Sequence, residues 1–201
     1  PIFLNESCWA FGNITYTAIY ASIGTSAAAS IQICSTIMNL FMIVAFGLAN
    51  AGVVIIGNEI GANRESEAIS ASKKISSLSF KISILLAIVL AFLSKPIVSF
   101  FNVSVEVKIA SEYILYVYAF ILVFKIYNAV MIVGILRGGG DATYGSILQG
   151  LTLWLIGIPL AAFAAFIIKL PIYFVVMFAA VEEIIKVFFM MKRFKSFKWI
   201  K

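Results

Sequence analysis

The feature that most constrains this chain is a run of 52 residues, Ser7 to Asn58, without a single Asp, Glu, Lys or Arg. Two membrane-spanning helices of roughly 20 residues each, joined by a turn, fit within a run of that length. The whole chain is 63% hydrophobic and 12% charged, which is about half the charged fraction of a soluble domain. We therefore expect a chain that crosses a membrane several times. A disordered chain is excluded because it would leave too much apolar surface in water.

Glycines and charges predict where six membrane spans end. The first two are separated at Ile23-Gly24-Thr25, and a kink or an emerging end is expected at Gly47–Gly52, because the second span exceeds the hydrocarbon core of about 30 Å. The third stops at Ser94-Lys95-Pro96 and the fourth at Arg137–Asp141. The expected spans are about 1–23, 26–56, 75–94, 110–136, 143–168 and 172–191. Apolar and polar residues do not alternate over any long stretch, as they would in the strands of a barrel. We therefore predict an all-α polytopic membrane protein.

Basic residues predict the orientation. If the chain crosses the membrane six times, nine Lys and Arg residues fall on one side of it: Arg64, Lys73, Lys74, Arg137, Lys192, Arg193, Lys195, Lys198 and Lys201. The opposite face has only Lys95, Lys108 and Lys169. The positive-inside rule predicts a multi-pass protein of the plasma (inner) membrane with both ends cytoplasmic. The basic tail 192–201, with its interleaved aromatic residues, suits an anionic lipid surface, so membrane lipid is expected as a partner and nucleic acid is not.

Several kinds of chemistry find no support in the residues. The sequence contains no histidine, which removes His-ligated metals and Ser-His-Asp triads. Cys8 and Cys34 lie in apolar runs, without the spacing of a redox motif. The glycines 138–140 lack the pattern of a phosphate-binding loop. We expect neither an enzyme nor a metal or organic cofactor.

Two charges fall inside expected spans, where charge is costly and therefore a candidate for function. Glu6 lies about 25 Å from the outer end of the first span, and Lys125 about 21–28 Å from that of the fourth. Because the depths agree, we hypothesise that they form a buried ion pair, or exchange it for a cation or proton, with Asn128 on the face of Lys125. A purely structural pair or a snorkelling lysine is the alternative.

Glu182 and Glu183 also lie deep, in the sixth span. Lys186 follows them by four and three residues, so it can neutralise both within one helix. We interpret this group as structural.

Polar side chains recur at helical spacing in the first, second and fourth spans. The residues predicted to line a substrate cavity are Asn13, Thr17, Tyr20, Gln32, Thr36, Asn39 and Tyr118. A cavity with amides, hydroxyls and aromatic rings suits amphipathic or cationic organic compounds. Taken singly, each residue fits ordinary interhelical hydrogen bonding, but three stripes that converge with two charges favour a cavity.

Motifs along nearly the whole chain resemble the MATE (multidrug and toxic compound extrusion) transporters. Pro1-Ile2-x-x-Asn5-Glu6-x-x-Trp9-x-x-Gly12 resembles the seventh helix of the family, and Trp154-x-x-Gly157-x-Pro159 resembles the eleventh. Gly57-x-x-Ile60-Gly61-Ala62 with Arg64 and Gly134-Ile135-Leu136-Arg137-Gly138-Gly139-Gly140-Asp141 resemble two cytoplasmic loops. The loop-motif residues are Gly57, Gly61, Arg64, Arg137, Gly138 and Asp141.

This resemblance implies one lobe of a twelve-helix, two-lobed transporter. Residues 1–201 would be the C-terminal six-helix lobe and the missing N-terminal lobe its partner, consistent with a chain that opens at Pro1 in apolar sequence. The implied activity is efflux of cationic or amphipathic compounds in exchange for Na⁺ or H⁺. Glu6 matches an acidic position of the family, but Lys125-x-x-Asn128 stands where many members carry Asp. The coupling site could therefore lie in the missing lobe.

Two other functions remain open. One is a flippase of the same superfamily for lipid-linked oligosaccharides or peptides, which calls for several basic cavity residues where only Lys125 is evident. The other is a membrane interaction protein that transports nothing, whose polar stripes only join helices.

Overall fold

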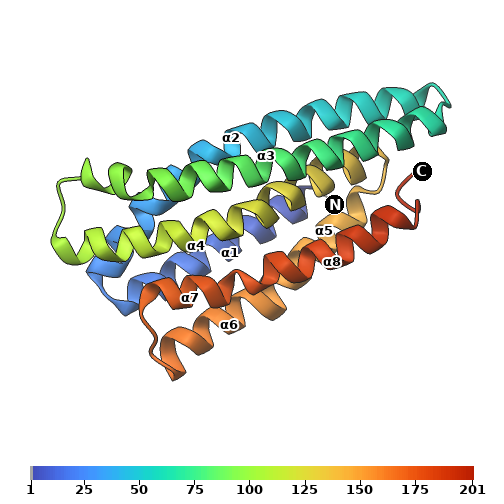
Figure 1. Cartoon of the computed structure of the whole chain (residues 1–201). Coiled ribbons are helices and arrows are strands. Elements are labelled where there is room, and N and C mark those ends of the chain that lie inside the picture. The colour runs from blue at the N-terminus through green and yellow to red at the C-terminus, as the bar shows by residue number, and fades with distance from the viewer. Residues whose placement is uncertain (1) are drawn as a thin grey trace.

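The computed structural model describes residues 2–201, with side chains from Glu6 onward, and this part of the chain is helical without a β-strand (Figure 1). The elements are α1 (Ile2–Ile23), α2 (Thr25–Gly61), α3 (Glu65–Ser99), α4 (Val105–Ala129), the π-helix η1 (Val130–Leu136), α5 (Ala142–Thr152), η2 (Leu153–Gly157), α6 (Ile158–Ala162), η3 (Phe163–Ile167), α7 (Ile172–Ala179) and α8 (Val181–Lys195). The all-α fold class is confirmed.

Within the described residues, four helical segments are long and apolar enough to cross a membrane. They are 25–61, 65–99, 105–136 and 142–167. The two chain ends, the turn between α2 and α3 and the start of α5 lie toward one end of the bundle (Figure 1). Of the 15 Lys and Arg residues, seven lie in or next to these segments: Arg64, Arg137, Lys192, Arg193, Lys195, Lys198 and Lys201.

The first turn forms where glycine predicts it. Gly24 separates α1 from α2 with φ 149°, a conformation that side chains rarely adopt, so one residue reverses the chain. At Gly47–Gly52, where a kink or an emerging end is expected, the chain stays helical, and α2 is a helix of 37 residues, about 55 Å long. It continues to Gly61, and its last turns project beyond the other helices together with α3 (Figure 1).

Two predicted span ends are wrong. Helix α3 does not stop at Ser94-Lys95-Pro96 but contains Pro96 and ends at Ser99. Proline so close to a C-terminus removes one backbone hydrogen bond and leaves the preceding turns intact. The single helix expected at 172–191 is two helices, because the chain turns at Ala180 and α8 then runs to Lys195.

Small residues bring the central helices into close contact. A Cβ atom on Gly52 of α2 would lie 3.3 Å from the Cα of Gly134 in η1, so the two backbones nearly touch. Along α3, buried serines donate hydrogen bonds to carbonyls of the preceding turn, as Ser79 does to Ser76 and Ser83 to Phe80. Helices in a membrane associate through such small residues, which let α2, α3, α4 and η1 pack tightly.

Candidate functional site

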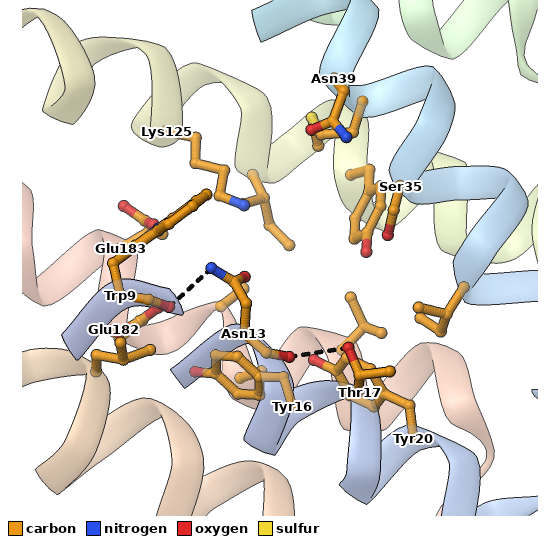
Figure 2. Close-up of a pocket in the computed structure, with 18 of the residues that line it drawn as sticks. Trp9, Asn13, Tyr16, Thr17, Tyr20, Ser35, Asn39, Lys125, Glu182 and Glu183 are labelled. Atoms are coloured by element: carbon orange, nitrogen blue, oxygen red, sulfur yellow. Dashed lines mark hydrogen bonds between the residues drawn. The ribbon is translucent and has the colours of Figure 1, made fainter. Parts of the chain in front are cut away.

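A cavity of about 470 Å³ is lined by residues of α1, α2, α4, α5, η2, α7 and α8 (Figure 2). Its polar and aromatic lining residues are Trp9, Asn13, Tyr16, Thr17, Tyr20, Gln32, Ser35, Asn39, Tyr118, Lys125, Gln149, Glu182, Glu183 and Lys186. Apolar side chains such as Ile31, Ile121 and Val176 separate them. A site of this size and mixed lining suits a small organic ligand.

Six of the seven predicted cavity residues line this space: Asn13, Thr17, Tyr20, Gln32, Asn39 and Tyr118. The prediction for Thr36 is wrong. Its hydroxyl donates to the backbone oxygen of Gln32 at 2.9 Å, one turn earlier, on an exposed part of α2. Thr36 follows Gln32 at helical spacing, but the cavity covers only one side of that stripe.

On α1, part of the polar lining is already bonded to the helix itself. Asn13 Nδ2 donates to the Trp9 carbonyl at 2.9 Å, and Thr17 Oγ1 donates to the Asn13 carbonyl at 2.8 Å (Figure 2). The rings of Tyr16 and Tyr20 stack with centroids 5.8 Å apart. Oxygen acceptors and aromatic faces therefore remain for a ligand on this wall.

The wall formed by α8 carries charge. Glu182 and Glu183 are each 7% exposed and Lys186 is 5% exposed. Lys186 Nζ lies 3.3 Å from Glu183 Oε1, and Asn128 Nδ2 donates to Glu183 Oε2 at 2.7 Å and to the Glu183 carbonyl at 2.9 Å. The predicted pairing within α8 is thus present for Glu183, but the group also borders the cavity.

Glu182 has a different environment from its neighbour. Its Oε2 atom and the hydroxyl of Tyr16 are both enclosed, and neither has a hydrogen-bond partner among the described residues. Both oxygens stand beside Gly157: a Cβ atom there would lie 3.0 Å from Glu182 Oε2 and closer still to Tyr16. Glycine at this position lets α1 and α8 bring the two oxygens together across η2.

Lys125 enters the cavity from α4 and is near enough to Glu182 and Glu183 for its charge to act on both (Figure 2). The hypothesis that Lys125 pairs with Glu6 is therefore wrong. Glu6 Oε1 lies 3.4 Å from Arg137 Nη2 at the end of the bundle, and the Glu6 side chain is 57% exposed. Lys125 precedes Arg137, the partner of Glu6, by 12 residues or about 18 Å along the same helical segment, so Glu6 and Lys125 differ in depth.

Sequence reasoning missed the acidic residues of α8 as cavity residues. Their depth in an apolar span was a sufficient signal, because buried charge in a membrane marks a functional site by default. The nearby lysine suggested a self-contained structural pair instead. No group of three or more His, Cys, Asp or Glu side chains in residues 2–201 is arranged to hold a metal ion.

Two of the loop-motif residues, Gly57 and Gly138, approach each other, whereas Gly61 and Arg64 lie at and just beyond the end of α2. Gly57 approaches the carbonyl oxygen of Gly138, and a Cβ atom on Gly138 would lie 3.1 Å from the Cα of Val53. Arg64 Nε pairs with Glu59 at 2.8 Å, beside Gly61, which is open to its surroundings. Two of these glycines thus serve helix packing.

Asp141 joins that loop to the C-terminal tail. Its side chain is 1% exposed and pairs with Arg193 and Lys201. Trp199 is fully buried, and the backbone nitrogen of Lys201 donates to the Gly139 carbonyl at 3.0 Å. The expectation that the aromatic residues of the tail lie on a lipid surface is therefore wrong for Trp199, because glycines 139 and 140 leave room for it against the loop.

The chain matches the MatE family model over residues 1–163. It is 27% identical over 172 residues to an uncharacterized transporter of Schizosaccharomyces pombe, covering 86% of this chain and 31% of that protein. It is 26% identical over 147 residues to the probable multidrug resistance protein NorM of Bacillus anthracis, covering 72% of this chain and 32% of that protein. The chain spans about a third of the length of these curated relatives.

Solved transporter structures share the fold. A MOP superfamily transporter from Pyrococcus furiosus superposes with a TM-score of 0.90 at 16% identity, covering 96% of this chain and 42% of that one. The Vibrio cholerae MATE transporter VcmN in its bent form superposes with a TM-score of 0.82 at 15% identity, covering 98% and 46%. The described fold therefore corresponds to slightly less than half of each of these transporters.

Proposed function

Since this chain belongs to the MatE family of transporters, we propose that it forms the C-terminal lobe of a secondary active antiporter. The antiporter exports cationic or amphipathic organic compounds in exchange for Na⁺ or H⁺ by alternating access. The lobe works with an N-terminal lobe of six helices, and rocking of the two lobes exposes the cavity to each side of the membrane in turn. Both ends of this chain face the cytoplasm of a plasma membrane.

The observation that supports this proposal best is the composition of the cavity. Tyrosine faces, amide oxygens and the two carboxylates of α8 surround a space of about 470 Å³. Aromatic faces attract organic cations, and a carboxylate in a water-poor site attracts them further. Apolar residues between these groups accept the hydrocarbon part of an amphipathic compound.

The flippase alternative is less well supported by the same cavity. A lipid-linked phosphate needs an excess of positive charge, whereas Lys125 and Lys186 stand beside Glu182 and Glu183. The charges of the described lining side chains therefore balance. Lys186 is moreover already paired with Glu183, at 3.3 Å. We therefore favour cations and amphipathic compounds as cargo.

The experiment uses the complete gene product reconstituted into proteoliposomes. The vesicles are oriented inside-out, so that export from the cell corresponds to uptake into the lumen. Ethidium uptake is followed by fluorescence, first with a higher Na⁺ or H⁺ concentration in the lumen and then with that gradient collapsed. Transport that requires one of these gradients supports the antiporter. Transport that is unchanged after both gradients collapse, or no ethidium transport at all, contradicts it.

A further inference from the structure

We propose that the coupling ion of this lobe is a proton carried by Glu182, and that a proton on Glu182 and an organic cation in the cavity exclude each other. The proposal rests on the proposed function, which leaves Na⁺ and H⁺ open. It assigns different roles to two consecutive glutamates on one helix. Their surroundings, not their positions in the sequence, carry the assignment.

Glu183 is held in its charged form by its partners. Lys186 and the Asn128 side chain together contact both of its carboxylate oxygens, at 3.3 and 2.7 Å. A proton on Glu183 would break this arrangement and leave the buried ammonium of Lys186 without its counter-charge, at a cost of several kcal/mol. Glu183 is therefore a fixed counter-ion.

Glu182 is free to change its charge. It is 7% exposed, and its enclosed Oε2 atom has no hydrogen-bond partner in the described chain. A buried carboxylate without a partner lowers its energy by taking up a proton. Since Glu182 borders the cavity, a proton can reach it when the cavity opens to water.

The titratable groups around Glu182 come from three directions. Tyr16 and Tyr20 face it from α1, Lys125 from α4, and Glu183 and Lys186 from its own helix. Gly157 of η2, which also lies beside Glu182, carries no charge. Both cations therefore lie within reach of both carboxylates.

This environment favours a proton over Na⁺. A sodium ion needs several oxygen ligands together, and both carboxylate oxygens of Glu183 are already engaged by Lys186 and Asn128. A proton needs only one carboxylate oxygen, and Glu182 Oε2 is such an oxygen, enclosed beside Gly157. Carboxylates buried in membrane transporters commonly serve as proton carriers for this reason.

Charge balance then links proton uptake to release of the cargo. With Glu182 ionised, the two carboxylates balance Lys125 and Lys186, and the cavity accepts an organic cation. A proton moving from the outer solution to Glu182 leaves one uncompensated positive charge, which repels that cation. When the cavity next opens to the cytoplasm, the proton leaves and a new cation binds. The cycle exchanges one proton for each cationic charge at this site.

The test measures ethidium binding and proton release with the complete gene product in detergent. For the unaltered protein, we expect affinity to fall as pH decreases, and ethidium binding to release about one proton into weakly buffered solution. Glu182→Gln should weaken binding by about tenfold or more at alkaline pH, make affinity independent of pH and abolish proton release. Glu182→Asp, which keeps a titratable carboxyl group, should retain both pH-dependent binding and proton release.

The control is Glu67→Gln, an exposed residue in the first turn of α3, which should leave binding and proton release unchanged. Thermal unfolding of Glu182→Gln in detergent shows whether the variant is folded, and Glu182→Asp provides the test if it is not. Proton release that persists in folded Glu182→Gln, or transport driven by Na⁺ at equal pH on both sides, overturns the proton assignment alone. Absence of ethidium binding in the unaltered protein overturns the proposed function as well.

Discussion

Arg193 Nε and Nη2 lie 2.7 and 2.6 Å from the same carboxylate oxygen of Asp141, although 52 positions separate the two residues. Lys201 pairs with the other oxygen of Asp141. Because Asp141 is 1% exposed, three charges and their hydrogen bonds meet where water is largely excluded. The loop after η1, the end of α8 and the C-terminal tail are therefore joined at one carboxylate.

Asp141→Asn should lower the free energy of unfolding by about 1–3 kcal/mol, since it removes the charge that holds Arg193 and Lys201. Thermal unfolding in detergent measures the change, and limited proteolysis should cut the tail 192–201 faster. Arg193→Lys keeps the positive charge but loses the planar fork, so its effect should be smaller. Equal melting of Asp141→Asn and the unaltered protein would contradict a stabilising role.

Gly139→Ala should release the tail from the loop. A Cβ atom at Gly139 would stand against the Trp199 ring and 2.5 Å from the Trp199 carbonyl oxygen, where nothing can shift cheaply. Faster proteolysis of the tail is the expected result. Gly61→Ala is the matched control, because a Cβ atom there meets nothing within 4 Å. A tail equally protected in both variants argues against docking of Trp199 on the loop.

Lys186→Met should destabilise the protein by about 3–5 kcal/mol, because it leaves the Glu183 carboxylate buried without its counter-charge. Adding Glu183→Gln should recover most of that loss, since the double variant buries no charge of this pair. Unfolding of both single variants and the double variant gives the coupling free energy. Additive effects of the two substitutions would show that the contact at 3.3 Å contributes nothing.

Gly134→Leu should separate η1 from α2. A Cβ atom at this position already lies 3.2 Å from the Ala49 carbonyl oxygen, so a larger side chain forces the helices apart and costs about 1–3 kcal/mol. Gly47→Leu, on an open part of α2, is the control and should have little effect. Thermal unfolding that is equally affected in both variants would rule out specific crowding at Gly134.

Much of the cavity could be predicted because helical spacing places residues on a common face before any packing is known. Asn13, Thr17 and Tyr20 follow that spacing on α1, and all three border the cavity. Thr36 shares the helical spacing of Gln32 but lies outside the cavity. Helical spacing shows which residues share one side of a helix. It does not show how much of that side the neighbouring helices leave uncovered.

Partners between helices could not be predicted in the same way. The distance from a span end indicates depth, and by depth alone Glu6 and Lys125 matched. In the folded bundle Glu6 lies beside Arg137, 12 residues beyond Lys125 on the same helical segment, whereas Lys125 lies near the carboxylates of α8. Helix packing therefore decides both the depth of a side chain and the partners that it meets. Likewise, Lys186 was within reach of both glutamates by spacing, but it contacts Glu183.

By itself, the sequence determined that this chain is a bundle of apolar helices with its basic residues gathered toward one end. Hydrophobicity is a local property, and a backbone in a membrane must satisfy its hydrogen bonds within helices. Only the tertiary structure decided that Glu183 is paired and Glu182 is not. That difference depends on Asn128, Tyr16 and Gly157, which three other parts of the chain bring to one place. Contacts between side chains of different helices exist only once those helices are packed, so spacing within one helix does not show them.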